Sequence, residues 1–539
     1  MTKEEWIQYF PYSEPRNEQV NAINSIIEAY KSGKKYAIVE CGTGVGKSAI
    51  GLTASKYIIN DKTHSSEKDN GAYFLTTQKV LQDQYEKDFF HLGMRSLYSS
   101  SNYQCKKSKG NTCSEIAQEL KANPDNQRLA GCKFDCIYKQ KKKSFIEDQL
   151  GITNFSYFLT EKNYSGKIPN KRILVIDEAH NLETELTRFI EITVSQFFAE
   201  KVLKIQFPKD LTTKFKSHKW IKEVYIVEVQ KKLDFMESQI KKIGISLDKL
   251  KEFKSLSNQL NTIKSHRDKI RMFLSLYDKE NWVFTDESTD KGFKKLVFKP
   301  IDVSSYANQY ILDFADFVIF MSATIVSHKG FAKTIGIEEG NYISIREKSP
   351  FDPKNRAIIF SPVGSMGFKS IDNTLPKMIE SIKCIIDEYP NEKGIIHTQN
   401  TKIATEIKNS IKSDRLLIAV GNNREEILKK HIKSKKPTIL VSPSMTEGVD
   451  LKGNLSSFQI ICKVPFPYLG DKVIKKKMSK WDWWYDTQTV RTIVQSVGRS
   501  IRCETDVATT YILDSDFARI KQRCEEYFPP GFFDEYHYA

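Results

Sequence analysis

Short runs of apolar residues recur along the chain, and stretches of helical length separate most of them. In the first half these runs are Tyr36–Glu40, Ala72–Thr77, Ile173–Asp177 and Phe317–Met321. In the second half they are Ala357–Phe360, Gly394–His397, Thr438–Val441, Gln459–Val464 and Thr510–Leu513. Strands that alternate with helices indicate parallel sheets flanked by helices. We therefore predict an α/β protein with two parallel sheets.

Two stretches break this alternation, and we predict that both are insertions into the first sheet domain. Residues 99–150 lack apolar periodicity but hold four cysteines and many lysines. Residues 191–299 are highly charged, and we expect them to be helical. Within them, apolar residues spaced by three and four form two seams on either side of Gly244–Ser246, which predicts an antiparallel helical hairpin. The pattern leaves open whether the hairpin is a solvated arm or takes part in catalysis.

Length and charge restrict the class of protein. A chain of 539 residues is too long for one core, so we expect three or four domains. The 83 Lys and Arg exceed the 67 Asp and Glu by 16 charges, and such a surplus favours nucleic acid as a partner. No apolar run reaches the roughly 18–20 residues of a membrane span, and the first ten residues lack the apolar core of a signal peptide. We expect a cytoplasmic protein with no membrane partner, or a nuclear one in a eukaryote.

A phosphate-binding loop lies between the first predicted strand and a helix predicted at Ser48–Ile59. It reads Cys41-Gly-Thr-Gly-Val-Gly-Lys47-Ser48. Lys47 is expected to reach the β- and γ-phosphates of ATP and Ser48 to hold Mg²⁺, while Cys41 stands where the full pattern has glycine. Backbone N–H groups and the positive end of the helix hold the phosphates, which assigns ATP binding to Gly42, Thr43, Gly44, Val45 and Gly46.

A pair of carboxylates supplies the second half of this site. The apolar strand Ile173–Asp177 ends in Asp177-Glu178-Ala-His180. With a phosphate loop upstream, Asp177 is expected at the Mg²⁺ ion and Glu178 near the attacking water. The loop and the carboxylates together predict a nucleoside triphosphatase.

Further motifs follow in order, and with them the chain resembles a known family. Asp177-Glu-Ala-His180, Ser322-Ala-Thr324, Glu447-Gly-Val-Asp450 and Gln495-Ser-Val-Gly-Arg499-Ser-Ile-Arg502 resemble a superfamily-two helicase. Asn154-Phe-Ser-Tyr157, Ser349-Pro-Phe351 and Pro465-Phe-Pro467 narrow the resemblance to the XPD/DinG family of iron–sulfur DNA helicases. It covers essentially the whole chain and implies two RecA-like lobes, with an iron–sulfur insertion and a helical arch in the first. Lobe 1 would comprise residues 1–98, 151–190 and 300–345, the cluster 99–150, the arch 191–299, and lobe 2 residues 346–539.

The resemblance also implies roles for single residues. Arg499 and Arg502 would reach the γ-phosphate and Gln495 the nucleotide or its water, so that hydrolysis depends on closure of the lobes. Gln19 lies in a segment, with Arg16, that would touch the base, although an ordinary N-terminal helix has the same sequence pattern. Residues that would couple hydrolysis to movement are His180, Ser322, Thr324 and Asp450.

Four cysteines in the first insertion predict a metal centre. Nine cysteines in a reducing compartment favour metal over disulfides. The cysteines Cys105, Cys113, Cys132 and Cys136 are separated by seven, eighteen and three residues. Structural zinc sites commonly use two tight pairs, and here there is one, so spacing alone favours iron–sulfur over zinc only modestly. Resemblance to the family, which carries a cluster at this place, implies a [4Fe–4S] cluster.

Several segments are candidates for DNA contact. By resemblance, Thr76, Thr77 and Gln78 would hold the strand's phosphates without reading sequence. Lysines near the cysteines, including Lys141, Lys142 and Lys143, favour phosphate contact no more than an ordinary solvated face. The basic and aromatic run from Lys475 to Tyr485 fits either stacking on bases or packing of the next helix. We favour packing for Trp484 and Tyr485 and leave Trp481 and Trp483 open.

The function expected from these residues is ATP-dependent unwinding of DNA, with single-stranded and forked duplex DNA as partners and 5′ to 3′ movement implied by the resemblance. One alternative is an RNA helicase of the DEAH type, but those usually end the last motif Gly-Arg-Ala-Gly-Arg, whereas this chain has Gly-Arg-Ser-Ile-Arg. Another is a translocase that remodels protein–DNA complexes without processive unwinding. A non-enzymatic scaffold is disfavoured by the intact Lys47, Asp177, Glu178 and Arg499.

Overall fold

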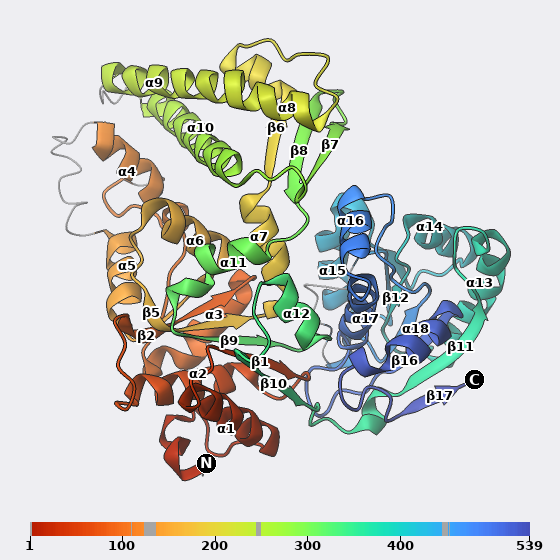
Figure 1. Cartoon of the computed structure of the whole chain (residues 1–539). Helices are drawn as coiled ribbons and strands as arrows, with labels where there is room; N and C mark the ends of the chain where they lie inside the picture. The colour runs from red at the N-terminus through yellow and green to blue at the C-terminus, as the bar shows by residue number, and fades with distance from the viewer. Residues whose placement is uncertain (1–2, 109, 123–135, 244–249, 445–450, 452) are drawn as a thin grey trace.

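The computed structural model describes residues 3–108, 110–122, 136–243, 250–444, 451 and 453–539. It contains two seven-stranded parallel sheets and one three-stranded antiparallel sheet. Figure 1 shows the two parallel sheets in separate lobes, lobe 1 nearer the N-terminus and lobe 2 at the C-terminus. In the described part of the chain, no helix is long and apolar enough to cross a membrane.

The sheet of lobe 1 has the order β10-β1-β9-β5-β2-β4-β3. Its strands are β1 Tyr36–Cys41, β2 Asp69–Thr76, β3 Met94–Ser96, β4 Leu150–Asn154, β5 Lys171–Asp177, β9 Phe317–Ser322 and β10 Tyr342–Glu347. Its helices are α1 Asn17–Lys31, α2 Lys47–Asn60, α3 Lys79–Phe89, α6 Phe155–Thr160, α7 Leu182–Ile190, α11 Ser304–Tyr310 and α12 His328–Thr334. The four predicted strands are confirmed. The other three, β3, β4 and β10, lie toward the edges of the sheet and were not predicted.

The sheet of lobe 2 has the order β13-β14-β12-β15-β16-β11-β17. Its strands are β11 Ile358–Gly364, β12 Gly394–His397, β13 Leu416–Ile418, β14 Ile439–Ser442, β15 Phe458–Ile461, β16 Thr509–Asp514 and β17 Tyr536–Tyr538. Its helices are α13 Ile371–Glu388, α14 Thr401–Ser410, α15 Arg424–Lys433, α16 Lys472–Lys480, α17 Trp484–Val497 and α18 Asp516–Cys524. All five predicted strands are confirmed. Separate apolar cores cover the two faces of this sheet.

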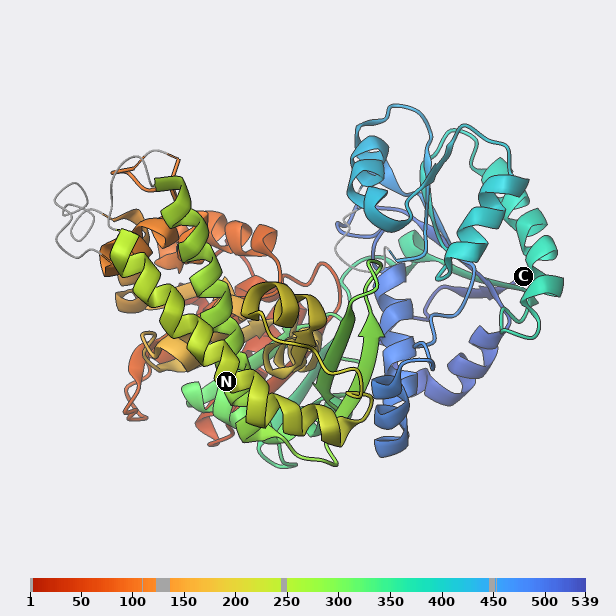
Figure 2. The ribbon, with the colours of Figure 1, turned by 90° about the horizontal axis from the view of Figure 1, so that it is seen from above.

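Two groups of elements outside the sheets are both connected to lobe 1. The first comprises α4 Cys113–Ala122 and α5 Ile137–Glu147. The second comprises β6 Ile192–Ser195, α8 Lys214–Trp220, α9 Ile226–Ile243, α10 Leu250–Leu276, β7 Trp282–Ser288 and β8 Lys294–Pro300. Figure 2 shows α9 and α10 side by side over the lobe 1 half of the molecule, so the predicted helical hairpin is confirmed. Its buried residues, among them Val229 and Ile270, join the core of lobe 1.

The prediction that residues 191–299 are helical throughout is wrong at both ends. Strands β6, β8 and β7 form a small antiparallel sheet there. The aromatic and β-branched residues at Trp282–Thr285 and Leu296–Phe298 favour strands, and Gly292, with φ 78°, lies in the turn between them. The many charged residues around these segments obscured the strand pattern in the sequence. The sheet forms the base from which the hairpin projects (Figure 1).

A buried carboxylate joins the strand before the phosphate loop to the end of lobe 1. Glu40 on β1 is 1% exposed and accepts hydrogen bonds from Arg346 Nε at 2.7 Å and from the backbone N–H of Val326 at 2.7 Å. Arg346 on β10 also donates to the carbonyl of Phe528 in lobe 2, at 3.1 Å. Val326 has φ 72°, which is rare for a β-branched residue. Glu40 therefore holds in place both an unusual turn and a contact between the lobes.

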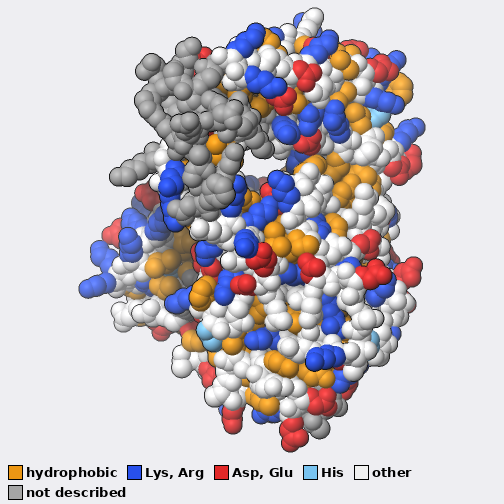
Figure 3. Space-filling view, turned by 90° about the vertical axis from the view of Figure 1, so that its left-hand side faces the viewer, with side chains coloured by type: hydrophobic (Ala, Val, Ile, Leu, Met, Phe, Trp, Pro, Cys, Tyr) orange, Lys and Arg blue, Asp and Glu red, His pale blue; other side chains and the backbone are white. Residues whose placement is uncertain are grey.

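The face that carries α4 and α5 is rich in positive charge. Figure 3 shows Lys and Arg side chains gathered there around a hollow between the hairpin and the body of lobe 1. Helix α5 alone supplies Lys139, Lys141, Lys142 and Lys143. The surplus of positive charge in the sequence is therefore partly concentrated on one face.

Candidate active site between the two lobes

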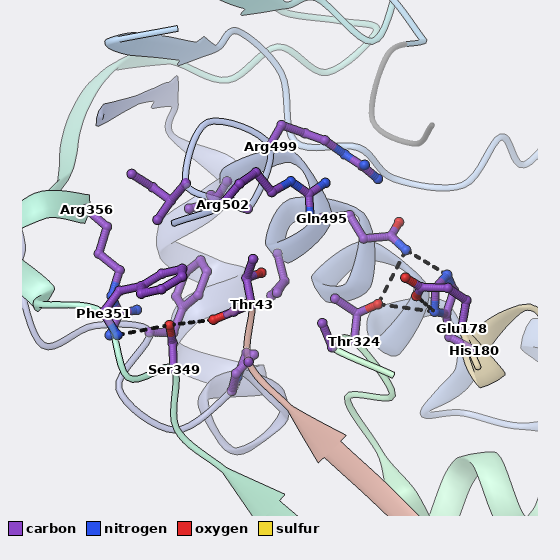
Figure 4. A pocket seen from close by; sticks show the side chains of 18 of the residues that line it. Thr43, Glu178, His180, Thr324, Ser349, Phe351, Arg356, Gln495, Arg499 and Arg502 are labelled. Atoms are coloured by element: carbon purple, nitrogen blue, oxygen red, sulfur yellow. Dashed lines mark hydrogen bonds and ion pairs between the residues drawn. The ribbon is translucent and has the colours of Figure 1, made fainter. Parts of the chain in front are cut away.

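A pocket lies between the lobes at the ends of the central strands of lobe 1 (Figure 4). The carboxyl ends of parallel strands are the usual place for a ligand in open α/β sheets. Lobe 1 contributes the residues that follow β1, β5 and β9, and lobe 2 contributes the end of α17 and the loop after it. The lining residues predicted from sequence are Gly42, Thr43, Thr77, Gln78, Glu178, His180, Thr324, Gln495, Arg499 and Arg502.

The phosphate loop connects β1 to α2, as predicted. Gly44 and Gly46 have φ values of 86° and 82°, a backbone conformation that glycine adopts without steric cost. Gly46 is the N-cap of α2 and has no side chain to occupy the first N–H groups of the helix. These groups are therefore open to an anion. Lys47 and Ser48 begin the helix but do not line the pocket.

The segment Ser349–Phe351 lies directly against the phosphate loop. Ser349 Oγ donates to the carbonyl of Thr43 at 2.9 Å. A Cβ atom on Gly44 would lie 1.9 Å from the ring of Phe351, and one on Gly42 would lie 2.8 Å from the backbone of Ser349. These glycines are thus required by close packing as well as by backbone conformation. The first residues of the link to lobe 2 form one wall of the pocket.

The two carboxylates at the end of β5 differ in environment. Asp177 is buried, and both of its oxygens accept hydrogen bonds, from Tyr85 Oη and from the backbone N–H of Glu178, each at 2.9 Å. Burial, together with the neighbouring charge of Glu178, raises the pKa of Asp177 to about 6. Glu178 lines the pocket with φ 54°. Burial would raise its pKa, but nearby groups, His180 first and then Lys47 and Arg499, hold it below its usual value.

His180 forms a polar bridge between the lobes. Its Nδ1 lies 2.8 Å from Ser322 Oγ, and its Nε2 lies 3.0 Å from the side-chain amide nitrogen of Gln495. Burial lowers the pKa of His180 to about 4, so the ring is neutral at pH 7. Because the Gln495 amide is a donor, Nε2 must accept and Nδ1 carries the proton toward Ser322. Gln495 also donates to Thr324 Oγ1 at 3.4 Å.

The structure thus brings together three of the four residues expected to couple hydrolysis to movement, together with Gln495. Asp450, the fourth, lies outside the described residues. Arg499 and Arg502 both line the same pocket from lobe 2. Gln19 lies beneath the loop, where a Cβ atom on Gly46 would come within 2.7 Å of its amide. Arg16 donates to the Gly44 carbonyl and pairs with Glu504 of lobe 2 at 2.6 Å.

Sequence reasoning missed Arg491 and Tyr85. Arg491 on α17 donates to the carbonyls of Thr324 and Ile325, at 3.2 and 3.5 Å. It precedes Gln495 by four residues and therefore shares its helix face, which is a signal that could have identified it. Tyr85 lies in the interior of α3, and nothing in the sequence distinguishes it from a core residue.

The structure separates the candidates for DNA contact. Thr77 and Gln78 line the same pocket as the residues assigned to ATP, whereas Thr76 is fully buried. Lys141 pairs with Glu86 at 3.0 Å and Lys142 with Glu161 at 2.5 Å. Lys143 is 72% exposed. Among these lysines, Lys143 has the side chain most open to a phosphate.

The basic and aromatic run before α17 packs against lobe 1. The ring of Trp483 covers Gly330 of α12, where a Cβ atom would lie 2.6 Å away. Lys477 pairs with Glu183 of α7, and both side chains are nearly buried. Trp484 is 7% exposed, as expected for a packing residue. Much of this run therefore forms an interface between the lobes.

Three of the four cysteines lie together. Cys105, Cys113 and Cys136 are buried in one small cluster with Ile116, and the sulfurs of Cys113 and Cys136 are 3.9 Å apart. Burial and the neighbouring thiols raise the pKa of Cys113 to about 11. Cys132 lies outside the described residues. Within the described ranges, no group of three or more His, Cys, Asp or Glu has the geometry of a metal site.

Comparisons with known proteins agree with this geometry. Residues 392–531 match the helicase C-terminal domain family, and residues 12–207 match the family described as type III restriction enzyme, res subunit. A probable ATP-dependent helicase of Methanocaldococcus jannaschii is 21% identical, over 94% of this chain and 93% of its own. The ATP-dependent DNA helicase YoaA of Escherichia coli is also 21% identical, over 94% and 92%. The ATP-dependent DNA helicase DinG of Photobacterium profundum is 28% identical, over 40% and 34%.

Solved structures extend the comparison to the fold. An XPD helicase superposes with a TM-score of 0.63 at 18% identity, covering 95% of this chain and 98% of the other. An XPD protein of S. tokodaii superposes with a TM-score of 0.56 at 13% identity, covering 97% and 100%. At these identities the likeness establishes the fold alone. This chain has two RecA-like lobes, as the XPD structures do.

The contacts of α17 with lobe 1 predict how the lobes respond to substitution. Arg491→Ala combined with Gln495→Ala removes hydrogen bonds from α17 to His180 and to the Thr324 segment. A hydrogen bond to a charged group contributes about 1.5–3 kcal/mol, so the lobes should separate, and X-ray scattering should give a larger radius of gyration. Arg519→Ala with Lys521→Ala on α18, which contact lobe 2 residues, is the matched control. A radius equal to that of the parent protein would show that α17 does not hold the lobes together.

Proposed function

We infer that this chain, a member of the XPD/DinG-like helicases of superfamily two, is an ATP-dependent DNA helicase that translocates on single-stranded DNA and unwinds forked duplexes. The observation that carries the inference is the pocket between the lobes. It combines a phosphate loop and Glu178 from lobe 1 with Gln495, Arg499 and Arg502 from lobe 2. Relatives named as ATP-dependent DNA helicases match nearly the whole chain.

The residues of the pocket and those directly beside it suit hydrolysis of a nucleoside triphosphate. Asp177 and the hydroxyl of Ser48 are oxygen ligands of the kind that Mg²⁺ prefers, and the bound ion would neutralise phosphate charge. Glu178, ionised at neutral pH because its pKa is held low, accepts a proton from the attacking water. Arg499 and Arg502 compensate the charge that develops on the γ-phosphate. Because they come from the other lobe, hydrolysis requires closure of the pocket.

The bridge at His180 supplies the coupling to movement. Its ring contacts Ser322 of lobe 1 and Gln495 of lobe 2 and lies 3.4 Å from Glu178. When hydrolysis changes the charge near Glu178, it therefore changes the electrostatic environment of the His180 ring, which is hydrogen-bonded to both lobes. Opening and closing of the lobes moves the strand, in the 5′ to 3′ direction by family resemblance.

DNA is favoured over RNA as the strand on which the protein moves. The relatives of E. coli and P. profundum are named DNA helicases, and the last motif Arg499-Ser-Ile-Arg502 differs from that usual in DEAH-type RNA helicases. Thr77 and Gln78 at the pocket edge and the positively charged face of Figure 3 provide phosphate contacts without base recognition.

We assign residues 99–150 to a [4Fe–4S] insertion and residues 191–299 to a helical arch. The fit rests on the buried thiols of Cys105, Cys113 and Cys136, with Cys132 as the fourth ligand. Thiolates can hold such a cluster, which would make the insertion rigid. The 3.9 Å between two sulfurs is also about the separation of two ligands on one tetrahedral zinc at ~2.3 Å. Zinc is therefore the alternative that metal analysis must separate from iron.

The first prediction tests the hydrolytic site. Glu178→Gln should lower DNA-stimulated ATP hydrolysis at least about a hundredfold, the usual contribution of a general base, and should leave ATP binding intact. Lys47→Ala should lose both. Lys329→Ala and Glu339→Gln, which change an exposed ion pair of lobe 1, are the controls. Hydrolysis at the parental rate in either site variant would refute the assignment.

A second prediction concerns the strand. Single-stranded DNA should stimulate hydrolysis more than RNA of the same length, and unwinding should require a 5′ single-stranded tail. Fluorescently labelled forks with 5′ tails, 3′ tails or ribose backbones measure both properties. Better unwinding of RNA duplexes would establish the DEAH-type alternative, and hydrolysis without unwinding of any fork would identify a translocase.

A third prediction concerns the cysteines. Cys113→Ser should remove the metal and abolish unwinding while hydrolysis falls less, because the phosphate loop and carboxylates lie outside the insertion. Iron, zinc and the visible absorption spectrum should be measured on protein prepared without oxygen. Cys384→Ser, at an exposed cysteine of lobe 2, is the control. Zinc without iron, or normal unwinding by Cys113→Ser, would contradict the iron–sulfur assignment.

A further inference from the structure

We propose that Tyr85 is a positioning residue that transmits the binding of DNA at the start of α3 to the metal-binding carboxylate of Asp177. The proposal rests on the helicase function inferred above and adds a route from the strand to the hydrolytic site. It starts from one hydrogen bond, in which Tyr85 Oη donates to Asp177 Oδ2 at 2.9 Å. Tyr85 is 4% exposed.

This hydrogen bond fixes the orientation of the carboxylate. A carboxylate held at one oxygen can rotate about its terminal bond, which has only broad preferences. Asp177 is held at both oxygens, by Tyr85 at Oδ2 and by the backbone N–H of Glu178 at Oδ1. In the described part of the chain, Tyr85 is the one side chain that hydrogen-bonds this carboxylate. Without the Tyr85 hydroxyl, the hydrogen bond from the backbone N–H of Glu178 is the restraint that remains on the Asp177 carboxylate.

The ring of Tyr85 cannot move independently of its helix. Phe74 and Phe89 pack against it, each with ring centroids 5.8 Å away. Buried side chains packed at this density lack space for another rotamer. A shift of α3 therefore displaces the hydroxyl relative to Asp177 and does not merely rotate the ring.

By the family resemblance, a DNA strand would contact the residues at the start of α3. Gln78 is its N-cap, and with Thr77 it lines the pocket edge. Lys79 Nζ in the first turn donates to Asn102 at 2.8 Å, in the segment that leads to Cys105. A force applied at these residues would shift the N-terminal end of α3. Tyr85 lies less than two helical turns after Gln78.

A second contact joins α3 to the cysteine insertion. Glu86, the residue next to Tyr85, forms an ion pair with Lys141 of α5, with 3.0 Å between Glu86 Oε1 and Lys141 Nζ. Gln82 is buried and donates to Ser96 Oγ at 2.8 Å and to the Leu97 carbonyl at 3.0 Å, which fixes α3 against the β3 edge of the lobe 1 sheet. Helix α3 therefore contacts the insertion and Asp177, and its first residues are those expected to contact the strand. A displacement of α3 by the DNA strand or by the insertion would therefore move the Tyr85 hydroxyl relative to Asp177.

The test compares Tyr85→Phe with the parent protein in the binding of Mn²⁺, followed by electron paramagnetic resonance in the presence of ADP. The variant keeps the buried ring and loses only the hydroxyl. The carboxylate then loses one of its two hydrogen-bond donors and is less well oriented for the metal. We expect Mn²⁺ affinity to fall about three- to tenfold, with ADP affinity in EDTA unchanged.

The same measurement tests the route from DNA. In the parent protein, single-stranded oligothymidine should change Mn²⁺ affinity, since binding energies at coupled sites are reciprocal. In Tyr85→Phe this effect of DNA should be lost, although DNA still binds. Tyr511→Phe, which removes a hydroxyl that donates to Glu388 in lobe 2 at 3.1 Å, is the matched control and should behave as the parent protein.

The outcomes separate this proposal from the function on which it rests. If the parent protein binds Mn²⁺ with ADP and responds to DNA, while Tyr85→Phe gives the same metal affinity and the same response, the role of Tyr85 is refuted and the helicase function stands. If the parent protein binds neither metal with nucleotide nor DNA, the proposed function itself fails. Reduced metal affinity with an unchanged response to DNA would refute the route through α3.

Discussion

A neutral imidazole held from both sides is the interaction on which the arrangement of the two lobes depends. His180 comes directly after the carboxylates of β5, and its two nitrogens contact Ser322 of lobe 1 and Gln495 of lobe 2. A protonated ring would have no acceptor to offer to the amide of Gln495. Burial keeps the ring neutral by lowering its pKa. Burial of the ring thus preserves the contact between the lobes and keeps Nε2 as the acceptor in it.

The remaining contacts between the lobes extend from this bridge along α17. Arg491 continues it toward the loop after β9, Lys477 toward α7, and Trp483 toward α12. At the other end of the pocket, Glu40 and Arg346 connect β1 to the last segment of lobe 2. Arginines brought to Glu178 by such a framework have a defined position before any ligand arrives, which lowers the reorganisation needed for catalysis.

Much of this framework could be predicted because it is built from local patterns. Central strands of a parallel sheet are continuous apolar runs, and every predicted strand is present. The phosphate loop and the carboxylates are adjacent to such strands, so predicting the strands also placed the motifs. His180, Thr324 and Gln495 were grouped by their order along the chain, and the structure brings them into contact.

What the sequence did not reveal depends on contacts between distant segments. Tyr85 and Arg491 gain their roles from partners 92 and 167 residues away, and neither belongs to a motif. The strands β6, β7 and β8 were hidden by charged neighbours on their solvated sides. Lys141 and Lys142 seemed available for phosphates, but their carboxylate partners, Glu86 and Glu161, lie on other helices. Pairing of this kind has no signature within either segment.

The distribution of the added elements makes the two lobes unequal. Helices α4 and α5 of the cysteine insertion and the hairpin of α9 and α10 all interrupt the sheet of lobe 1, and most of the hairpin's buried residues belong to its core. The sheet of lobe 2 carries no comparable addition among its described residues. Lobe 1 with its additions is therefore the larger body, so a rotation of the lobes relative to each other in solution displaces lobe 2 more than lobe 1.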